Sequence, residues 1–200
     1  MRKLVLTFDL DDTIFDASWI FRDAWCKAFL NKKDKPDFVY PSIWNYHDDP
    51  NWKGDPAACL DDEFMAVDRL TLTTLDDKNV AVMLNNIIHN PMFEVYFITK
   101  RPLYMDTYKQ IEFNDIEIDR DHVITTDMKV EAIEFVNSDL HFDDAPHILD
   151  EVKTAKVIIS NDKTLYNHKW VDEHPDVPHY TNIRVALKNL KSILEQYGLK

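Results

Sequence analysis

The chain has 200 residues, of which 45% are hydrophobic and 12% aromatic, so it holds enough apolar material for one compact domain with a small inserted second one. It contains only two glycines, which excludes the phosphate-binding loops that need several glycines in one short segment. A net charge of −13 disfavours duplex nucleic acid and anionic membranes as partners. No apolar run reaches the roughly 18 residues of a membrane span. Because the two cysteines lie outside any paired motif, we expect a reduced, cytoplasmic protein.

Short apolar segments that end in polar residues are predicted to be the strands of a sheet. They cover residues 3–9, 93–99, 122–126, 140–144 and 155–160. Helical spacing of apolar residues predicts helices around 21–29, 128–136 and 185–197. Strands that alternate with helices are typical of an α/β fold with a doubly wound, Rossmann-like parallel sheet. Ligands bind such sheets at the carboxyl ends of the strands.

The segment between the first two predicted strands is too long for a single helical crossover. It contains a helix, a loop rich in proline, tryptophan and aspartate at 36–56, and helical pieces at 61–75 and 78–88. We therefore predict an α/β core formed by residues 1–16 and 89–200, with residues 17–88 inserted as a small helical cap above the strand ends.

The segment 9–13 carries three aspartates, starting at the last residue of the first predicted strand. Asp9 and Asp11 begin on the same face, because residues two apart in an extended chain point the same way. Two adjacent carboxylates resist joint ionisation unless a cation compensates them, and Mg²⁺ suits an all-oxygen site. Taken alone, the segment fits a capped turn with solvated acids equally well.

Three further segments place polar groups at strand ends. The hydroxyl of Thr99, with Lys100 beside it, could grip a phosphate oxygen, and Lys129 starts a predicted helix, where anions are favoured. The adjacent acids Asp143 and Asp144 are costly at a buried strand end unless metal, cations or amides pair with them. Each of these also has an ordinary structural explanation, but their occurrence at successive strand ends favours a functional site.

The order of these segments resembles the haloacid dehalogenase-like superfamily of phosphotransferases. The resemblance covers residues 9–144 and implies that Asp9 is a nucleophile that forms an aspartyl-phosphate. It implies that Asp11 is the general acid and base, and that Thr99 and Lys129 hold the phosphoryl group. Position 12 is Asp12, where many relatives have glycine.

The same resemblance implies a Mg²⁺ site. Its ligands would be Asp9, the backbone carbonyl of Asp11 and the acid pair at 143–144. Within that pair we favour Asp144 as the direct ligand, with Asp143 orienting Lys129 or a metal-bound water.

Secondary features are similar to the 5′(3′)-deoxyribonucleotidase group within that superfamily. They are the helical insertion, the segments 98–102 and 42–44, and the closing helix after 182–184. The resemblance implies removal of phosphate from nucleoside monophosphates, with Trp44 of the cap as the candidate that stacks on a base. For Trp19, Tyr46 and Trp52 ordinary packing within the cap is the favoured interpretation.

We therefore expect a Mg²⁺-dependent phosphatase of small phosphomonoesters, with a nucleoside monophosphate as the expected substrate and no membrane partner. Several alternatives stay open at this point. They are a phosphatase of another small metabolite or of nucleic acid ends, a phosphoryl-transferring mutase, and a metal-binding interaction module without turnover. The sequence does not decide how many copies assemble, a homodimer included.

Overall fold

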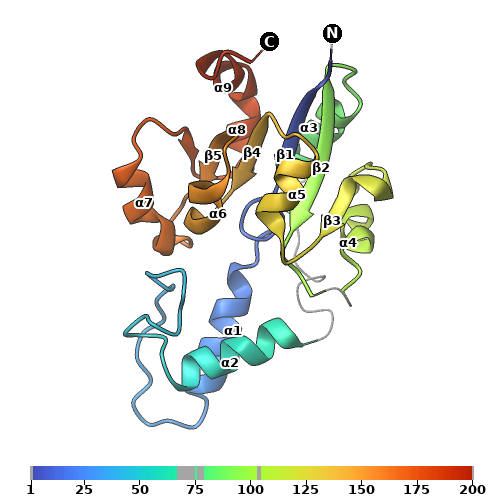
Figure 1. Cartoon of the computed structure of the whole chain (residues 1–200). Helices are drawn as coiled ribbons and strands as arrows, with labels where there is room; N and C mark the ends of the chain where they lie inside the picture. Colours follow the sequence, from blue (N-terminus) through green and yellow to red (C-terminus); the bar gives the residue numbers. More distant parts are fainter. Residues whose placement is uncertain (1, 67–74, 76–78, 103–104, 200) are drawn as a thin grey trace.

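The computed structural model describes residues 2–66, 75, 79–102 and 105–199, and its centre is a six-stranded parallel sheet (Figure 1). The strand order is β3-β2-β1-β4-β5-β6, with parallel pairing throughout. The predicted doubly wound α/β fold is confirmed. The strands are β1 (Leu4–Phe8), β2 (Phe93–Thr99), β3 (Val123–Thr125), β4 (Leu140–Asp143), β5 (Ala155–Ile159) and β6 (His179–Tyr180).

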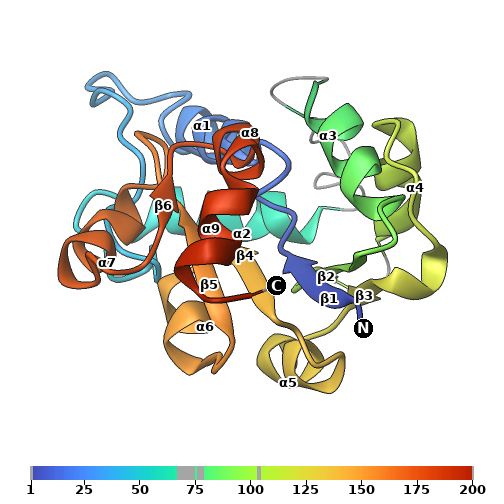
Figure 2. The ribbon, with the colours of Figure 1, turned by 90° about the horizontal axis from the view of Figure 1, so that it is seen from above.

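Helices cover both faces of this sheet, with α5 and α6 on one side and α3 and α8 on the other (Figure 2). Both faces must therefore be apolar, and on β2 Phe97 packs on one side while its neighbour Ile98 packs on the other. The helices are α1 (Ser18–Ala28), α2 (Asp55–Met65), α3 (Asn79–Ile88), α4 (Thr107–Phe113), α5 (Lys129–Phe135), α6 (Pro146–Glu151), α7 (His168–Glu173), α8 (Ile183–Lys188) and α9 (Leu190–Gln196). Among the described residues, no helix combines the length and the apolar character that crossing a membrane requires.

The C-terminal helix differs from its prediction. The apolar spacing of 185–197 predicts one helix, but α8 and α9 are separate and meet at Asn189. The Asn189 side chain donates to the backbone carbonyl of Val185 at 2.8 Å and so competes with continued helical hydrogen bonding. The helices α4, α6 and α7, which have six or seven residues, and the two-residue β6 are absent from the sequence-based prediction.

The helices α1 and α2 lie beyond the carboxyl ends of the strands, away from the sheet (Figure 1). They have an aromatic core of their own, in which the Trp52 ring contacts Phe21 edge-on and Trp25 at a tilt. Of the predicted helical piece 61–75, residues 67–74 lie outside the described part of the chain.

Helix α3 does not share the aromatic core of α1 and α2. Its residues Val80, Ala81 and Leu84 are buried together with Leu6 and Phe8 of β1, in the cluster on one face of the sheet. The prediction assigned residues 17–88 to the cap. Because α3 packs on the sheet, we propose that the boundary between cap and core falls before α3.

Candidate active site

Side chains from separate strand ends line one cavity of about 320 Å³ between the sheet and the cap. Asp9 follows β1, Thr99 ends β2, and Lys129 begins α5. Asp143 ends β4, and Asp144 follows it. All five line the cavity and are buried. The expectation that these segments converge is thus met in space, because parallel strands present their carboxyl ends at the same edge of a sheet.

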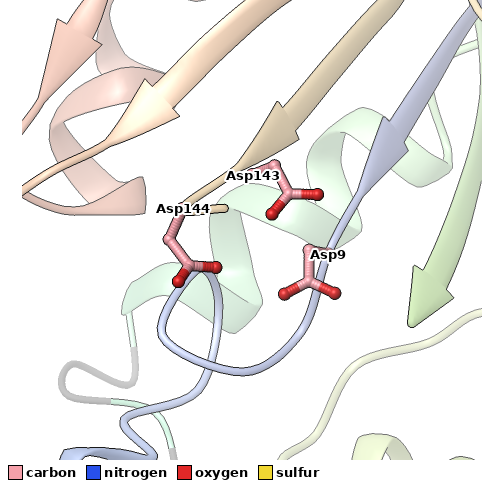
Figure 3. A group of neighbouring side chains, drawn as sticks. All are labelled: Asp9, Asp143 and Asp144. Atoms are coloured by element: carbon pink, nitrogen blue, oxygen red, sulfur yellow. The ribbon is translucent and has the colours of Figure 1, made fainter. Parts of the chain in front are cut away.

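Three of these carboxylates form a compact cluster. Asp9, Asp143 and Asp144 each offer an oxygen, and these atoms lie within 4.8 Å of one another. Figure 3 shows the three side chains directed toward a common point at the ends of β1 and β4. The Lys129 Nζ atom lies 2.6 Å from Asp9 Oδ1 and 2.6 Å from Asp143 Oδ2. One buried ammonium therefore faces three buried acids.

The acids respond to this environment in different directions. Burial raises the pKa of Asp9 to about 7, against the opposing attraction of Lys129. Burial and the neighbouring acids Asp143 and Asp9 also raise the pKa of Asp144 well above its ordinary range. For Asp143 burial would raise the pKa, but Lys129 and His141 outweigh burial and lower it. If all three acids were ionised, the cluster would carry more negative charge than Lys129 balances.

Asp143 is held by several partners at once. Its Oδ2 atom faces Lys129 and lies 2.8 Å from His141 Nε2, while Oδ1 accepts a hydrogen bond from the Ala145 amide at 2.9 Å. His141 in turn lies 2.9 Å, at Nδ1, from Thr7 Oγ1. Because these contacts occupy both oxygens, the arrangement suits the expected role of Asp143 in orienting Lys129.

Asp144 has fewer charged partners than Asp143. Its Oδ1 atom accepts a hydrogen bond from the Thr13 hydroxyl at 3.1 Å, and its Oδ2 atom accepts one from the Tyr166 hydroxyl. Asn167 supports the same turn by donating to the Asp144 carbonyl at 2.9 Å. Both side-chain donors are neutral, so they leave the charge of Asp144 uncompensated.

The donor set of this cluster fits a divalent metal ion. It consists of carboxylate oxygens, which hard divalent cations prefer. Three buried acids with one ammonium are costly in a low-dielectric site unless a further positive charge is supplied. Asp9 and Asp144 would be direct ligands, whereas Asp143 is already engaged by Lys129, His141 and a backbone amide.

Asp11 lines the cavity but its side chain lies outside this cluster. Arg101 donates from Nε to Asp11 Oδ2 at 2.8 Å and from a terminal nitrogen to Asp11 Oδ1 at 2.5 Å. The resemblance assigned Asp11 to the metal through its backbone carbonyl, and that assignment stays a prediction. Lys100 is exposed and lines the cavity next to Thr99, so it is available as the expected phosphate-binding cation.

The turn after β1 puts residue 12 in a left-handed backbone conformation. Asp12 has a φ of 56°, a left-handed conformation that favours glycine and that aspartate accepts better than most residues. Its carboxyl accepts a hydrogen bond from the Ala17 amide at 3.1 Å. Burial, together with Asp11 and Asp16, raises the pKa of Asp12 to about 8.

The far wall of the cavity is mostly aromatic and comes from the cap. Trp44 and Tyr46 line it, and Trp44 has its ring centroid 4.8 Å from that of His147 and 4.9 Å from that of Tyr166. Trp44 therefore bridges cap and core. Trp52, in contrast, is fully buried in the cap, as the packing interpretation predicted.

Sequence reasoning left three residues out of the site. They are Arg101, Tyr166 and His147. Arg101 binds Asp11, Tyr166 binds Asp144, and His147 lines the cavity. One feature of the sequence could have indicated Tyr166: the polar run at 166–168 follows a strand, and strand ends gather at this edge of the sheet.

The sheet and the helices around it match solved structures of hydrolases. A hydrolase from Pseudomonas syringae superposes with a TM-score of 0.61 at 15% identity, over 96% of this chain and 99% of its own. A HAD family hydrolase from Deinococcus radiodurans R1, solved with bound phosphate and sodium, has a TM-score of 0.60 at 11% identity, over 99% of this chain and 98% of its own. A β-phosphoglucomutase from Clostridium difficile has a TM-score of 0.52 at 10% identity, over 98% of each chain.

The fold is therefore that of the haloacid dehalogenase-like hydrolases. No family model matches the sequence, and no curated protein matches it significantly. At these sequence identities the solved structures establish the shared fold, and the chemistry has to be argued from the site.

Proposed function

We propose that the protein is a Mg²⁺-dependent phosphatase that hydrolyses small phosphomonoesters. The observation that carries this proposal is the buried group formed by Asp9, Lys129, Asp143 and Asp144 at the floor of a cavity. In this group Asp9 would serve as the nucleophile, Lys129 as a cation for phosphoryl oxygens, and the carboxylates of Asp9 and Asp144 as ligands for a metal ion. The HAD family hydrolase from Deinococcus radiodurans R1, which shares this fold, was solved with bound phosphate and sodium, and this supports phosphate as a ligand.

Hydrolysis would proceed in two steps. In the first, an oxygen of Asp9 bonds to phosphorus while the bond from phosphorus to the leaving oxygen breaks, and protonated Asp11 gives its proton to that oxygen. In the second, a water oxygen bonds to phosphorus, the bond between Asp9 and phosphorus breaks, and Asp11 takes the proton of the water. Bound Mg²⁺ would neutralise charge on the carboxylates and on the phosphoryl oxygens.

The remaining polar residues would bind the phosphoryl group. Lys129 and Thr99 line the cavity, and so does Lys100, which is exposed. Charge on the equatorial phosphoryl oxygens is the main quantity that such a site must stabilise.

We further propose a nucleoside monophosphate as the substrate, as in a 5′(3′)-deoxyribonucleotidase. A cavity of about 320 Å³ accommodates a leaving group of this size. Its cap side is lined by Phe21, Trp44, Tyr46 and Phe64, and such aromatic faces stack on planar bases.

The deciding experiment is a phosphate-release screen of ribonucleotides, deoxyribonucleotides, sugar phosphates and phosphorylated DNA ends, with Mg²⁺ and with EDTA. We expect Mg²⁺-dependent release with a preference for nucleoside monophosphates. Asp9→Asn should abolish turnover and leave the circular dichroism spectrum unchanged, so near-normal activity of this variant would remove the nucleophile assignment. Failure of the wild-type protein on the whole panel would favour a metal-binding module without turnover.

A further inference from the structure

A buried arginine forms an ion pair with Asp11. Arg101 follows β2 by two residues, and its side chain is fully buried, at 0% exposure. Its neighbours Lys100 and Pro102 line the cavity, whereas Arg101 is not among the lining residues. The guanidinium is therefore placed to act on Asp11 rather than on a ligand in the cavity.

The contact between the two side chains fixes the Asp11 carboxylate at both oxygens. Arg101 donates to Oδ2 at 2.8 Å and to Oδ1 at 2.5 Å, which is the two-point geometry that an arginine fork makes and a lysine cannot. A third nitrogen of Arg101 donates to Gln110 Oε1 of α4 at 2.5 Å. Gln110 is itself buried, so Arg101 is anchored to the core at the same time.

This anchoring separates Asp11 from the neighbouring acids. Asp11 is 23% exposed to the cavity side, yet its carboxylate does not belong to the cluster of Asp9, Asp143 and Asp144. That cluster has a surplus of negative charge, and a bound cation would attract any mobile carboxylate nearby. A side chain held at both oxygens cannot turn toward such a cation without breaking two charge-assisted hydrogen bonds.

We propose that Arg101 is a positioning residue that keeps Asp11 out of the cation site and thereby reserves it for proton transfer. The inference rests on the proposed function, because proton transfer is the task for which Asp11 is reserved. Arg101 stays charged throughout and supplies no proton. When an Asp11 oxygen takes up a proton, that oxygen gives up its hydrogen bond from Arg101 while the other oxygen keeps its own. This proton passes to the leaving oxygen, and the proton released by the attacking water returns to Asp11.

The first test measures Mg²⁺ affinity by calorimetry, without any substrate. Arg101→Gln frees the Asp11 carboxylate, and we expect Mg²⁺ to bind about tenfold more tightly. In Arg101→Gln combined with Asp11→Asn this gain should vanish, because the freed ligand is gone. Lys100→Gln is the matched control, since it removes an equal charge from the adjacent position. A gain of similar size in Lys100→Gln, or one that persists in the double variant, would show that charge alone is responsible and would overturn the proposal.

The second test measures p-nitrophenol release from p-nitrophenyl phosphate before steady state. This leaving group needs little protonation, so Arg101→Gln should form the aspartyl-phosphate quickly and hydrolyse it slowly, giving a burst close to one equivalent. With an alkyl phosphate the same variant should lose at least about tenfold more of its rate than with the aryl ester. Equal losses on both substrates, with no burst, would indicate a merely structural role and contradict the proposal.

Two further variants keep these outcomes interpretable. Arg101→Lys retains the buried charge and replaces Arg101→Gln in the tests if the glutamine variant does not fold. It should bind Mg²⁺ more tightly than wild type, although less tightly than the glutamine variant. The double variant should be no slower than Asp11→Asn alone, because both changes act through one side chain. If wild-type protein shows no turnover, the proposed phosphatase fails, while the Mg²⁺ measurements still decide whether Arg101 restrains Asp11.

Discussion

Replacement of Asp9 by asparagine should stabilise the metal-free protein at neutral and alkaline pH, although it removes the proposed nucleophile. Asp9 is only 6% exposed, and burial raises its pKa from 3.8 to about 7 even though Lys129 opposes the rise. Asparagine has nearly the same shape and cannot ionise. The variant therefore keeps the packing of the site and escapes the cost of a buried negative charge.

The sign and size of the effect follow from linkage between protonation and folding. A carboxyl whose pKa is raised on folding contributes stability that is complete below the unfolded pKa and is lost as pH rises through the folded pKa. For Asp9 the loss begins near pH 4 and is complete somewhat above pH 7. A rise from 3.8 to about 7 corresponds to about 4 kcal/mol.

Urea unfolding in EDTA, from pH 5 to pH 8.5, measures this difference directly. The stability of Asp9→Asn relative to wild type should increase by about 1.4 kcal/mol for each pH unit up to pH 7 and then level off. Asp119→Asn, a change in the loop before β3, should leave the pH dependence as in wild type. A variant that is equally stable or less stable than wild type at pH 8.5 would refute the reasoning, because it would mean that the Asp9 carboxylate is well compensated without a metal ion.

Three more measurements follow from the site and the cap. Lys129→Met should cost about 3–5 kcal/mol at pH 8 because it strands two buried carboxylates. The cost should be smaller at pH 5, where Asp9 takes up a proton, and a loss independent of pH in urea unfolding would speak against this. Trp52→Ala, at a fully buried position, should lower the free energy of unfolding by about 3–5 kcal/mol. Trp44→Ala, at 44% exposure, should lower it by less than about 1 kcal/mol and mainly raise KM. Equal losses of stability would contradict the assignment of Trp52 to packing and of Trp44 to substrate binding. Added Mg²⁺ should raise the Tm of EDTA-treated protein in a concentration-dependent manner, and a Tm that does not respond would argue against the cation site.

The parallel sheet was predictable because its central strands are apolar on both faces. Residues such as Phe97 and Ile98 pack on opposite sides of the sheet, so the strands appear in the sequence as continuous apolar runs. The short helices α4, α6 and α7 contain only two turns or less, which is too few for a helical period to be recognised. Helix α3 was recognised as a helix, but its packing on the sheet depends on the tertiary fold.

Much of the candidate site was predictable for a related reason. Asp9, Thr99, Asp143 and Asp144 each follow or end a strand, and the strand rule alone brings them to one edge. Arg101 could not be assigned in this way, because the direction of its side chain depends on the turn that follows β2 and on Gln110 of α4. Tyr166 reaches Asp144 from a separate loop for which no local pattern specifies a partner.

Charge balance links the acid cluster to the ion pair between Arg101 and Asp11. Lys129 compensates part of the charge of Asp9 and Asp143, and Arg101 compensates Asp11. The four carboxylates of Asp9, Asp11, Asp143 and Asp144 therefore exceed these two buried cations by two charges, which is the charge of one divalent ion. Burial raises the pKa values of Asp9 and Asp144, and the neighbouring acids raise them further, so without such an ion protons reduce the imbalance. Protons and a divalent cation thus compete for the same carboxylates, while the acid held by Arg101 is kept apart from that competition.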